Sequence, residues 1–220
     1  MEDGLDSEAT FARARAEMVH AQLRGRGIRD ARVLDAMNRI PRHLFLDPEQ
    51  RGHAYDDAPI PIGHGQTVSQ PYIVAFMTEM LELQRQERVL EVGTGSGYQT
   101  AVLAGLVSEV YTVEVLEILS QRAQAVLRQL AVRNIHFAVG DGHLGWKEAA
   151  PFDAILVAAV AVTVPPSLQD QLAEGGRMIL PLGEDHQDLW IFRRTGHAIT
   201  SRRLLPVRFV PLVGRESASS

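Results

Sequence analysis

The chain has 220 residues, 45% of them hydrophobic, and a net charge of −5, which fits one globular domain with a substantial core. It contains no cysteine, which excludes disulfides, thiolate catalysis and cysteine-ligated zinc. The acidic balance argues against nucleic acid or an anionic membrane as partner. The N-terminus is acidic where a signal peptide would be basic, and no apolar run approaches about 20 residues, so we expect a cytoplasmic protein.

The first part of the chain predicts two helices and a long loop. Residues 9–24 have a loosely amphipathic helical pattern. Asp30 is a candidate N-cap for a second helix, which Pro41 ends. From Pro48 to Ser69 prolines and glycines recur with no sustained period, so this stretch predicts a long loop, and loops of that length are commonly functional.

From Arg88 onward, predicted strands and helices alternate. The strands are expected at 89–92, 110–113, 135–139, 152–157 and 178–182, and the helices at 98–106, 117–130 and 166–172. This alternation predicts an α/β fold with a doubly wound, mostly parallel sheet. After Pro181 no helix is expected, and strands at 189–193 and 204–212 predict antiparallel pairing at the C-terminal end.

The expected organisation is a single domain in two parts. Residues 1–87 form an N-terminal helical extension with the long loop, packed on a core formed by residues 88–214. Residues 215–220 are expected to be a disordered tail.

A glycine-rich turn is the most informative local motif. Gly93, Gly95 and Gly97 alternate between a predicted strand and a predicted helix, where glycine lets a ligand approach the backbone closely. An ordinary strand-to-helix turn needs only one glycine. A dinucleotide fingerprint requires glycine at position 98, and the bulky Tyr98 would crowd the helix N-terminus that receives a pyrophosphate. The motif therefore predicts a small-molecule site and disfavours an NAD-dependent oxidoreductase.

Three acidic residues, Glu91, Glu114 and Asp141, occur at the ends of successive predicted strands. Glu114 is placed to accept hydrogen bonds from a ribose diol, and Asp141 can reach an adenine amino group. A charged strand end and a plain Gly-Asp-Gly turn remain the alternatives for these two residues. Acidic groups suit a cationic, ribose-bearing cofactor and repel phosphates. We therefore expect S-adenosylmethionine, a sulfonium without phosphate, with S-adenosylhomocysteine as product.

Longer motifs resemble one family, the protein-L-isoaspartate O-methyltransferases. The segment 54–72 is similar to that family's signature, most specifically in its Gln-Thr-Val-Ser-Gln-Pro run at 66–71. Supporting matches occur at 24–28, 41–45, 140–146, 152–155, 172–183 and 209–212. The resemblance covers roughly residues 15–214 of the chain.

The resemblance implies a seven-stranded, Rossmann-like methyltransferase sheet, with the last two strands exchanged relative to the usual methyltransferase order. It implies an enzyme that methylates the free α-carboxylate of L-isoaspartyl residues in damaged proteins and peptides, leading through a succinimide to aspartate. Ser69 matches the catalytic position, and Thr67, Ser69, Val210 and Leu212 match substrate-binding positions. The matching cofactor positions are Thr67, Glu91, Gly93, Thr94, Gly95, Ser96, Gly97, Glu114, Val115, Asp141 and Gly142. Val213 stands where many members have threonine, so a hydroxyl contact is lost there.

The expected chemistry depends on placement more than on proton transfer. A carboxylate with a pKa of about 4 is already ionised at neutral pH and needs no strong base. Ser69 has no obvious base beside it in sequence, so we interpret its hydroxyl as a donor that orients the substrate carboxylate and as the N-cap of the next helix. His64, between two glycines, is interpreted as a surface or packing residue.

Two other functions remain open. One is a tailoring O-methyltransferase that acts on an aspartate of a modified peptide, and the other is a non-catalytic S-adenosylmethionine-binding regulator. In each case we expect no metal, no nucleic acid and no membrane partner, and a monomeric chain.

Overall fold

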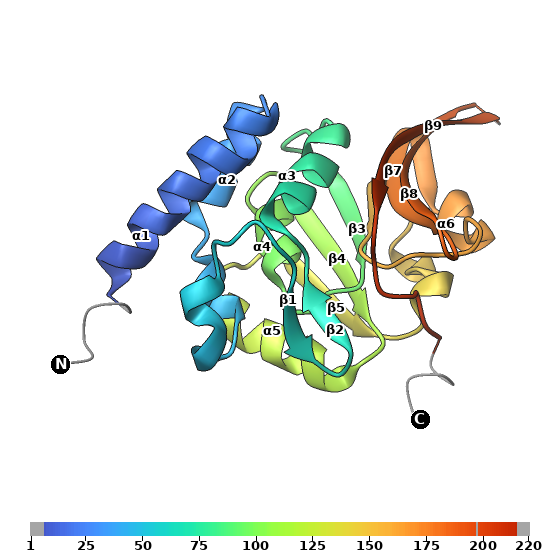
Figure 1. The fold of residues 1–220 in the computed structure, drawn as a ribbon. Coiled ribbons are helices and arrows are strands. Elements are labelled where there is room, and N and C mark those ends of the chain that lie inside the picture. Colours follow the sequence, from blue (N-terminus) through green and yellow to red (C-terminus); the bar gives the residue numbers. More distant parts are fainter. Residues whose placement is uncertain (1–6, 197, 215–220) are drawn as a thin grey trace.

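The computed structural model describes residues 7–196 and 198–214, so the predicted tail at 215–220 lies outside the described residues. A seven-stranded sheet forms the centre, with the N-terminal helices on one side and the C-terminal strands at one edge (Figure 1). The strand order is β5-β4-β3-β6-β7-β8-β9. The bounds are β3 Arg88–Val92, β4 Glu109–Glu114, β5 Ile135–Val139, β6 Phe152–Val157, β7 Leu172–Gly183, β8 Gln187–Thr195 and β9 Ala198–Val207.

The pairing confirms the predicted fold class. β3 to β7 pair in parallel, and β8 and β9 continue the sheet as antiparallel strands in chain order. β7 begins earlier than expected, because the predicted helix at 166–172 ends early as α6 (Pro166–Asp170). The strand predicted at 204–212 ends at Val207, and the following residues leave the sheet edge. Pro206 and Pro211 supply no N–H donor there, which limits how far a ladder can extend.

Helices cover both faces of the sheet and bury two hydrophobic clusters. The first cluster joins α4 (Tyr98–Ala104) and α5 (Glu117–Gln129) to the N-terminal helices. The second lies on the other face of the sheet, where α6 and the short helical turns around Trp146 cover it. The carboxyl ends of the parallel strands are left open between these layers.

The N-terminal helices differ in part from the prediction. The helix expected at 9–24 is divided into α1 (Glu8–Glu17), a π-helical stretch (Met18–Leu23) and a short 3-10 turn (Arg24–Arg26). The second helix, α2 (Ala31–Arg39), begins as predicted, because the side chain of Asp30 accepts a hydrogen bond from the backbone of Arg32. None of the helices in the described part of the chain is long and apolar enough to cross a membrane.

The stretch from 48 to 69 is more ordered than a loop, which corrects the prediction. It contains a 3-10 helix (Pro48–His53) and a small antiparallel hairpin made by β1 (Ile60–Gly63) and β2 (Gln66–Val68). Its two central turn residues, His64 and Gly65, have φ values of 53° and 68°, the geometry of a tight two-residue hairpin. His64 is thus an exposed turn residue. The hairpin leads directly into α3 (Pro71–Met80).

Candidate active site

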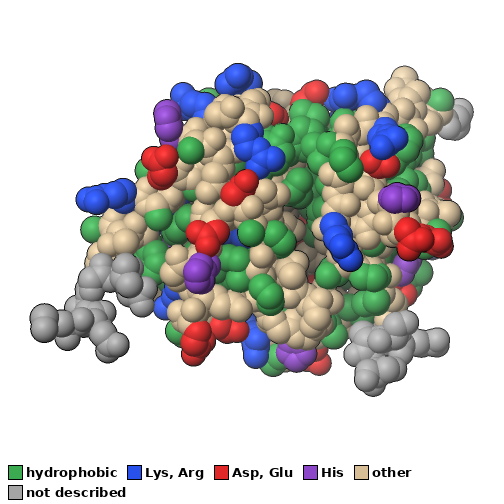
Figure 2. All heavy atoms as spheres, in the orientation of Figure 1, with side chains coloured by type: hydrophobic (Ala, Val, Ile, Leu, Met, Phe, Trp, Pro, Cys, Tyr) green, Lys and Arg blue, Asp and Glu red, His purple; other side chains and the backbone are tan. Residues whose placement is uncertain are grey.

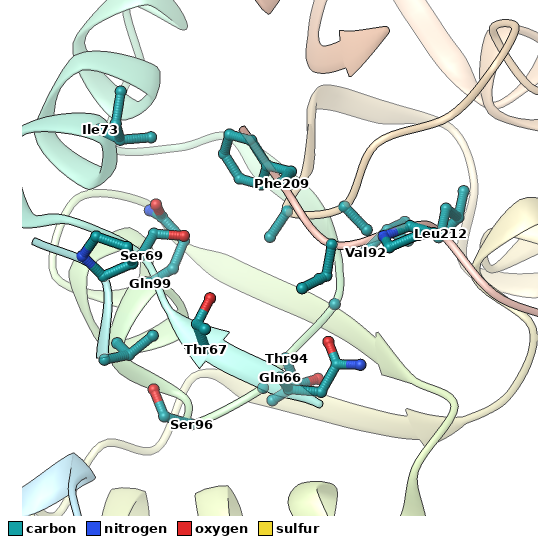
Figure 3. Close-up of a pocket in the computed structure, with 18 of the residues that line it drawn as sticks. Gln66, Thr67, Ser69, Ile73, Val92, Thr94, Ser96, Gln99, Phe209 and Leu212 are labelled. Atoms are coloured by element: carbon teal, nitrogen blue, oxygen red, sulfur yellow. The ribbon is translucent and has the colours of Figure 1, made fainter. Parts of the chain in front are cut away.

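A cavity of about 510 Å³ opens at the carboxyl ends of β3 and β4. Its walls are the glycine turn, the β1–β2 hairpin with the start of α3, and residues 206–213, which we call the strap (Figure 3). Figure 2 shows hydrophobic side chains at the surface where α3 faces the C-terminal strands. The cavity therefore brings together segments that are far apart in the sequence.

The glycine turn has the backbone geometry that its sequence predicts. Gly93, Gly95 and Gly97 have φ values of 94°, 52° and 88°, which are strained for any other residue. Gly93 and Gly95 line the cavity together with Thr94 and Ser96. Gly97 does not line the cavity. It faces α5, and a Cβ atom at this position would lie only 2.9 Å from the Cβ of Ala123. The third glycine therefore allows α5 to pack closely.

Glu114 presents a fixed carboxylate to the cavity. The residue is nearly buried, and its Oε2 accepts a hydrogen bond of 2.8 Å from the Gly95 amide. Its Oε1 accepts one of 3.0 Å from the Leu116 amide. A carboxylate has about four acceptor sites, so lone pairs remain for the hydroxyl groups of a ligand. Val115, the next residue, also lines the cavity.

Glu91 lies behind the cavity wall. Its side chain is fully buried, and its Oε2 accepts hydrogen bonds from the hydroxyls of Thr100 (2.6 Å) and Thr112 (2.7 Å). The hydroxyl of Thr112 in turn lies 2.6 Å from that of Thr94, which is at the cavity wall. Glu91 thus supports the wall through threonines and does not line the cavity.

Asp141 also lies outside the lining. It caps a short 3-10 turn, with Oδ1 accepting a hydrogen bond of 2.9 Å from the backbone amide of His143. The following residue, Gly142, does line the cavity. A side chain at Gly142 would collide with Val92 and approach Leu212, so glycine leaves the space between the sheet and the strap open.

Ser69 and Thr67 both line the cavity from the hairpin side (Figure 3). The hydroxyl of Ser69 has no hydrogen-bond partner among the residues that the structure describes, and no cap bond to α3. The N-cap of α3 is Gln70, so the predicted capping role of Ser69 is wrong. The residue before a proline is driven to an extended backbone, which makes Gln70, before Pro71, the boundary of the helix.

The strap closes the opposite side. Val210 and Leu212 line the cavity, and the backbone of the strap bonds to Val160 at two points. The Val160 amide donates to the Val210 carbonyl at 2.9 Å, and the Leu212 amide donates to the Val160 carbonyl at 2.8 Å. Val213 is also part of the lining.

Several lining residues had been given no role from the sequence, although Gln66 and Phe209 lie within the motifs that resemble the family. Phe209 of the strap and Ile73 of α3 project toward the cavity, and Gln66 and Gln99 add amide groups to its wall (Figure 3). Gln99 is the second residue after the glycine turn, and this closeness to the turn is the only sequence feature that pointed to it. No group of three or more potential metal-ligating side chains occurs in the described residues.

The site suits a cationic, ribose-bearing cofactor. Glu114 is the one acidic and Arg208 the one basic residue among those that line the cavity, and the glycine turn brings backbone close to a ligand. A mostly parallel sheet of this order with antiparallel C-terminal strands, a glycine turn after one strand and a carboxylate ending the next is the arrangement expected of a class I S-adenosylmethionine-dependent methyltransferase.

Comparison with known proteins identifies the family. The family model described as protein-L-isoaspartate(D-aspartate) O-methyltransferase matches residues 13–217, and the chain belongs to this family. The chain is 51% identical to a protein-L-isoaspartate O-methyltransferase of Opitutus terrae, over 93% of this chain and 91% of the relative. It is 54% identical to that of Aeromonas hydrophila, over 87% of this chain and 94% of the relative.

A solved structure has the same fold. A Plasmodium falciparum protein, described as a putative protein-L-isoaspartate O-methyltransferase in complex with S-adenosyl-L-homocysteine, superposes with a TM-score of 0.80 at 29% identity. The alignment covers 90% of this chain and 98% of that protein. The expected cofactor of this chain, S-adenosylmethionine, follows from its family.

Proposed function

We propose that this protein is a repair enzyme that transfers a methyl group from S-adenosylmethionine to the free α-carboxylate of L-isoaspartyl residues in damaged proteins and peptides. The observation that supports this most directly is that one cavity is bounded by both the glycine turn with Glu114 and the segment with Ser69. The methyl donor and the methyl acceptor can therefore meet in a single cavity. The methyl ester then loses methanol as the neighbouring backbone nitrogen attacks it, and the resulting succinimide hydrolyses in part to aspartate.

On the cofactor side, we assign Glu114 to the ribose hydroxyls, because its carboxylate is already fixed by two backbone amides. Gly93 and Gly95 allow close approach of the ligand to the backbone, and Val115 and Gly142 flank the space for the base. The other proposed cofactor residues at the wall are Thr67, Thr94 and Ser96. Bound S-adenosylmethionine supplies an electrophilic methyl group on a cationic sulfur.

On the acceptor side, the residues place and desolvate a nucleophile that is already charged. The hydroxyl of Ser69 donates a hydrogen bond to one oxygen of the isoaspartyl carboxylate, which leaves the other oxygen free to attack the methyl carbon. The apolar side chains of Ile73, Phe209 and Leu212 exclude water that would otherwise solvate that oxygen. Holding the reacting atoms about 3 to 3.5 Å apart lowers the barrier by several kcal/mol.

The test uses a pair of peptides that differ only in an isoaspartyl or a normal aspartyl linkage, with a labelled methyl donor. The expected result is transfer to the isoaspartyl peptide alone. Transfer to the aspartyl peptide alone would instead indicate the tailoring O-methyltransferase, which would use the same cofactor cavity. Binding of the cofactor with no transfer to either peptide would indicate the regulator.

The role of Ser69 is tested by Ser69→Ala. Removal of a hydrogen bond to a charged group costs about 1.5 to 3 kcal/mol, so kcat/KM for the isoaspartyl peptide should fall about 10- to 100-fold. Affinity for S-adenosylhomocysteine should be unchanged. Ser201→Ala, on the exposed side of β9, is the matched control and should retain full activity. Full activity in Ser69→Ala would contradict the assignment.

We further infer that residues 1–87 and 88–214 act as one domain, in a cytoplasmic monomer that does not bind nucleic acid. One observation supports the single domain, and a second supports the absence of nucleic acid as a partner. The first hydrophobic cluster contains residues from both parts, among them Met37 and Leu103. The net charge of −5 disfavours a phosphate backbone as partner.

A further inference from the structure

The side chain of Arg42 is a buried cation beside the active-site segment. It belongs to a 3-10 helix (Arg42–Phe45), and none of its surface is exposed. A buried charge is costly unless other groups compensate it. Arg42 forms no ion pair with a described carboxylate, and its guanidinium lies 4.7 Å from the centre of the Tyr98 ring. Burial lowers the pKa of Arg42 to about 10, so the group is still charged at neutral pH.

The hydrogen bonds of Arg42 go to the two ends of one segment. Its Nε donates to the carbonyl of Ala54 at 2.7 Å, and its Nη2 donates to the carbonyl of Ser69 at 2.8 Å. Residues 54–69 include the β1–β2 hairpin with Thr67. One planar side chain thus fixes the backbone at both ends of the segment, at Ala54 and at Ser69.

Stability alone does not account for this arrangement. The third nitrogen, Nη1, is buried without a hydrogen-bond partner among the described residues, which adds to the cost of burial. A well-packed apolar side chain would avoid that cost. A surface tie already joins residues close to these two ends, because Gln70 donates to both the carbonyl and the carboxylate of Asp57. What Arg42 adds is a direct bond to the backbone of Ser69.

We propose that Arg42 is a positioning residue for methyl transfer, which sets the place of the Ser69 hydroxyl by holding the Ala54 and Ser69 carbonyls together. This inference rests on the proposed role of Ser69. Arg42 does not touch the substrate, because it lies behind the segment and is absent from the cavity lining. Its effect should therefore appear mainly in turnover, with a smaller effect on cofactor binding, because Thr67 is the one proposed cofactor residue that lies in the segment 54–69.

The test compares Arg42→Lys and Arg42→Gln with the wild-type enzyme. A lysine ammonium keeps the charge but lacks the planar fork that reaches two carbonyls in different directions. Displacement of a catalytic group by about 1 Å can cost about 100-fold, so kcat for the isoaspartyl peptide should fall about 10- to 100-fold. The dissociation constant of S-adenosylhomocysteine should change less than about threefold, which also shows that each variant is folded.

Arg177→Lys is the matched control. Arg177 is also buried, and it also donates to backbone carbonyls, those of Leu81 and Asp153. Unlike Arg42 it forms an ion pair, with Glu87, and none of its described hydrogen bonds goes to the segment 54–69. Its replacement should lower the thermal midpoint at least as much as Arg42→Lys does, with kcat unchanged below the melting range. Equal kcat in wild type, Arg42→Lys and Arg42→Gln would overturn the proposal.

A double-mutant cycle separates this inference from the proposed function. If Arg42 acts through Ser69, adding Ser69→Ala to Arg42→Lys should lower kcat by less than about twofold more. A full, multiplicative effect of Ser69→Ala in that background would overturn the positioning role. Failure of the wild-type enzyme to methylate the isoaspartyl peptide would instead overturn the proposed function itself.

Discussion

The carboxyl group of Glu91 lies in an environment where its ionisation is unfavourable. Desolvation by burial raises its pKa to about 8, against the lowering effect of the hydrogen bonds from Thr100 and Thr112. Its Oε1 has no hydrogen-bond partner among the described residues. At neutral pH the group is therefore mostly protonated, and it supports the cavity wall as a neutral carboxylic acid.

This raised pKa predicts a pH dependence of stability. Between the ordinary pKa of about 4.5 and the folded value of about 8, the folded state holds a proton that the unfolded state releases. The free energy of unfolding should therefore fall as pH rises from 5 through 8, by a few kcal/mol in all. Glu91→Gln should flatten this fall in denaturant titrations. Glu148→Gln, at an exposed glutamate, is the control, and a slope unchanged in Glu91→Gln would refute the assignment.

The residue scale also shows what sequence patterns can and cannot place. Gly93, Gly95 and Glu114 line the cavity at the strand ends, because their positions follow from the strand ends along the chain. Gly97 was also expected at the ligand site, but it faces α5. Glu91 was expected at the ligand site because it precedes the glycine turn. Side chains alternate along a strand, so Leu90 and Val92 face one hydrophobic cluster and Glu91 points to the opposite side of the sheet, toward Thr100.

The strap is an element held by few bonds. Gln187 at the start of β8 contacts both backbone groups of Phe209, since the Phe209 amide donates to Oε1 at 2.6 Å and Nε2 donates to the Phe209 carbonyl at 3.3 Å. The first two strap residues, Pro206 and Val207, end β9 and pair with β8, and beyond Val207 the other described hydrogen bonds are the two to Val160. One glutamine side chain therefore fixes the backbone of Phe209 in the middle of the strap.

Gln187→Ala should loosen the strap and leave the glycine turn and Glu114, on the cofactor side of the cavity, unchanged. We expect the KM for the isoaspartyl peptide to rise about five- to tenfold, with kcat and cofactor affinity changed much less, because about two hydrogen bonds of roughly 1 kcal/mol each are lost. Hydrogen exchange at the Phe209 amide should accelerate in parallel. Gln121→Ala on the exposed side of α5 is the control. An unchanged KM and unchanged hydrogen exchange at the Phe209 amide would show that the bonds to Val160 are sufficient to hold the strap in place.

The hairpin shows why one element was missed. Its strands have four and three residues, too few for alternation of apolar and polar residues to be recognised. The turn residues His64 and Gly65 are not the Asn-Gly pair that usually marks a tight hairpin. For the strap, the sequence resemblance assigned Val210 and Leu212 to the substrate site, but the segment was expected to be a strand up to residue 212. Its pairing with Val160 after β9 ends was not predicted, because that pairing depends on tertiary contacts.

The whole molecule combines a rigid sheet with a cavity made of distant segments. The alternation of strands and helices was sufficient to predict the sheet, because buried parallel strands and crossover helices have strong local patterns. The closing of the cavity by the hairpin and the strap required the three-dimensional structure. Ligand binding should therefore stabilise the molecule by linking these segments.

S-adenosylhomocysteine at about 100 times its dissociation constant should add about 2.7 kcal/mol to the free energy of unfolding. For a chain of this size, this corresponds to a rise of about 5 to 10 °C in the thermal midpoint, measurable by calorimetry. NAD at the same concentration is the control and should cause no shift, because the carboxylate of Glu114 in the cavity wall repels phosphates. Tyr98, which was expected to crowd a pyrophosphate, is fully buried and does not line the cavity. A shift with NAD alone would revive the dinucleotide interpretation.

The position of the strap in the sequence has a consequence for how the enzyme is made. A ribosome synthesises the chain from residue 1, so the glycine turn and Ser69 emerge well before residues 206–213. A nascent chain with residues up to 205 outside the ribosome contains the glycine turn, Glu114 and Ser69. It lacks the strap, whose apolar side chains exclude water from the cavity. We therefore expect methyl transfer to begin only once this late segment has been translated and has formed its hydrogen bonds with Val160.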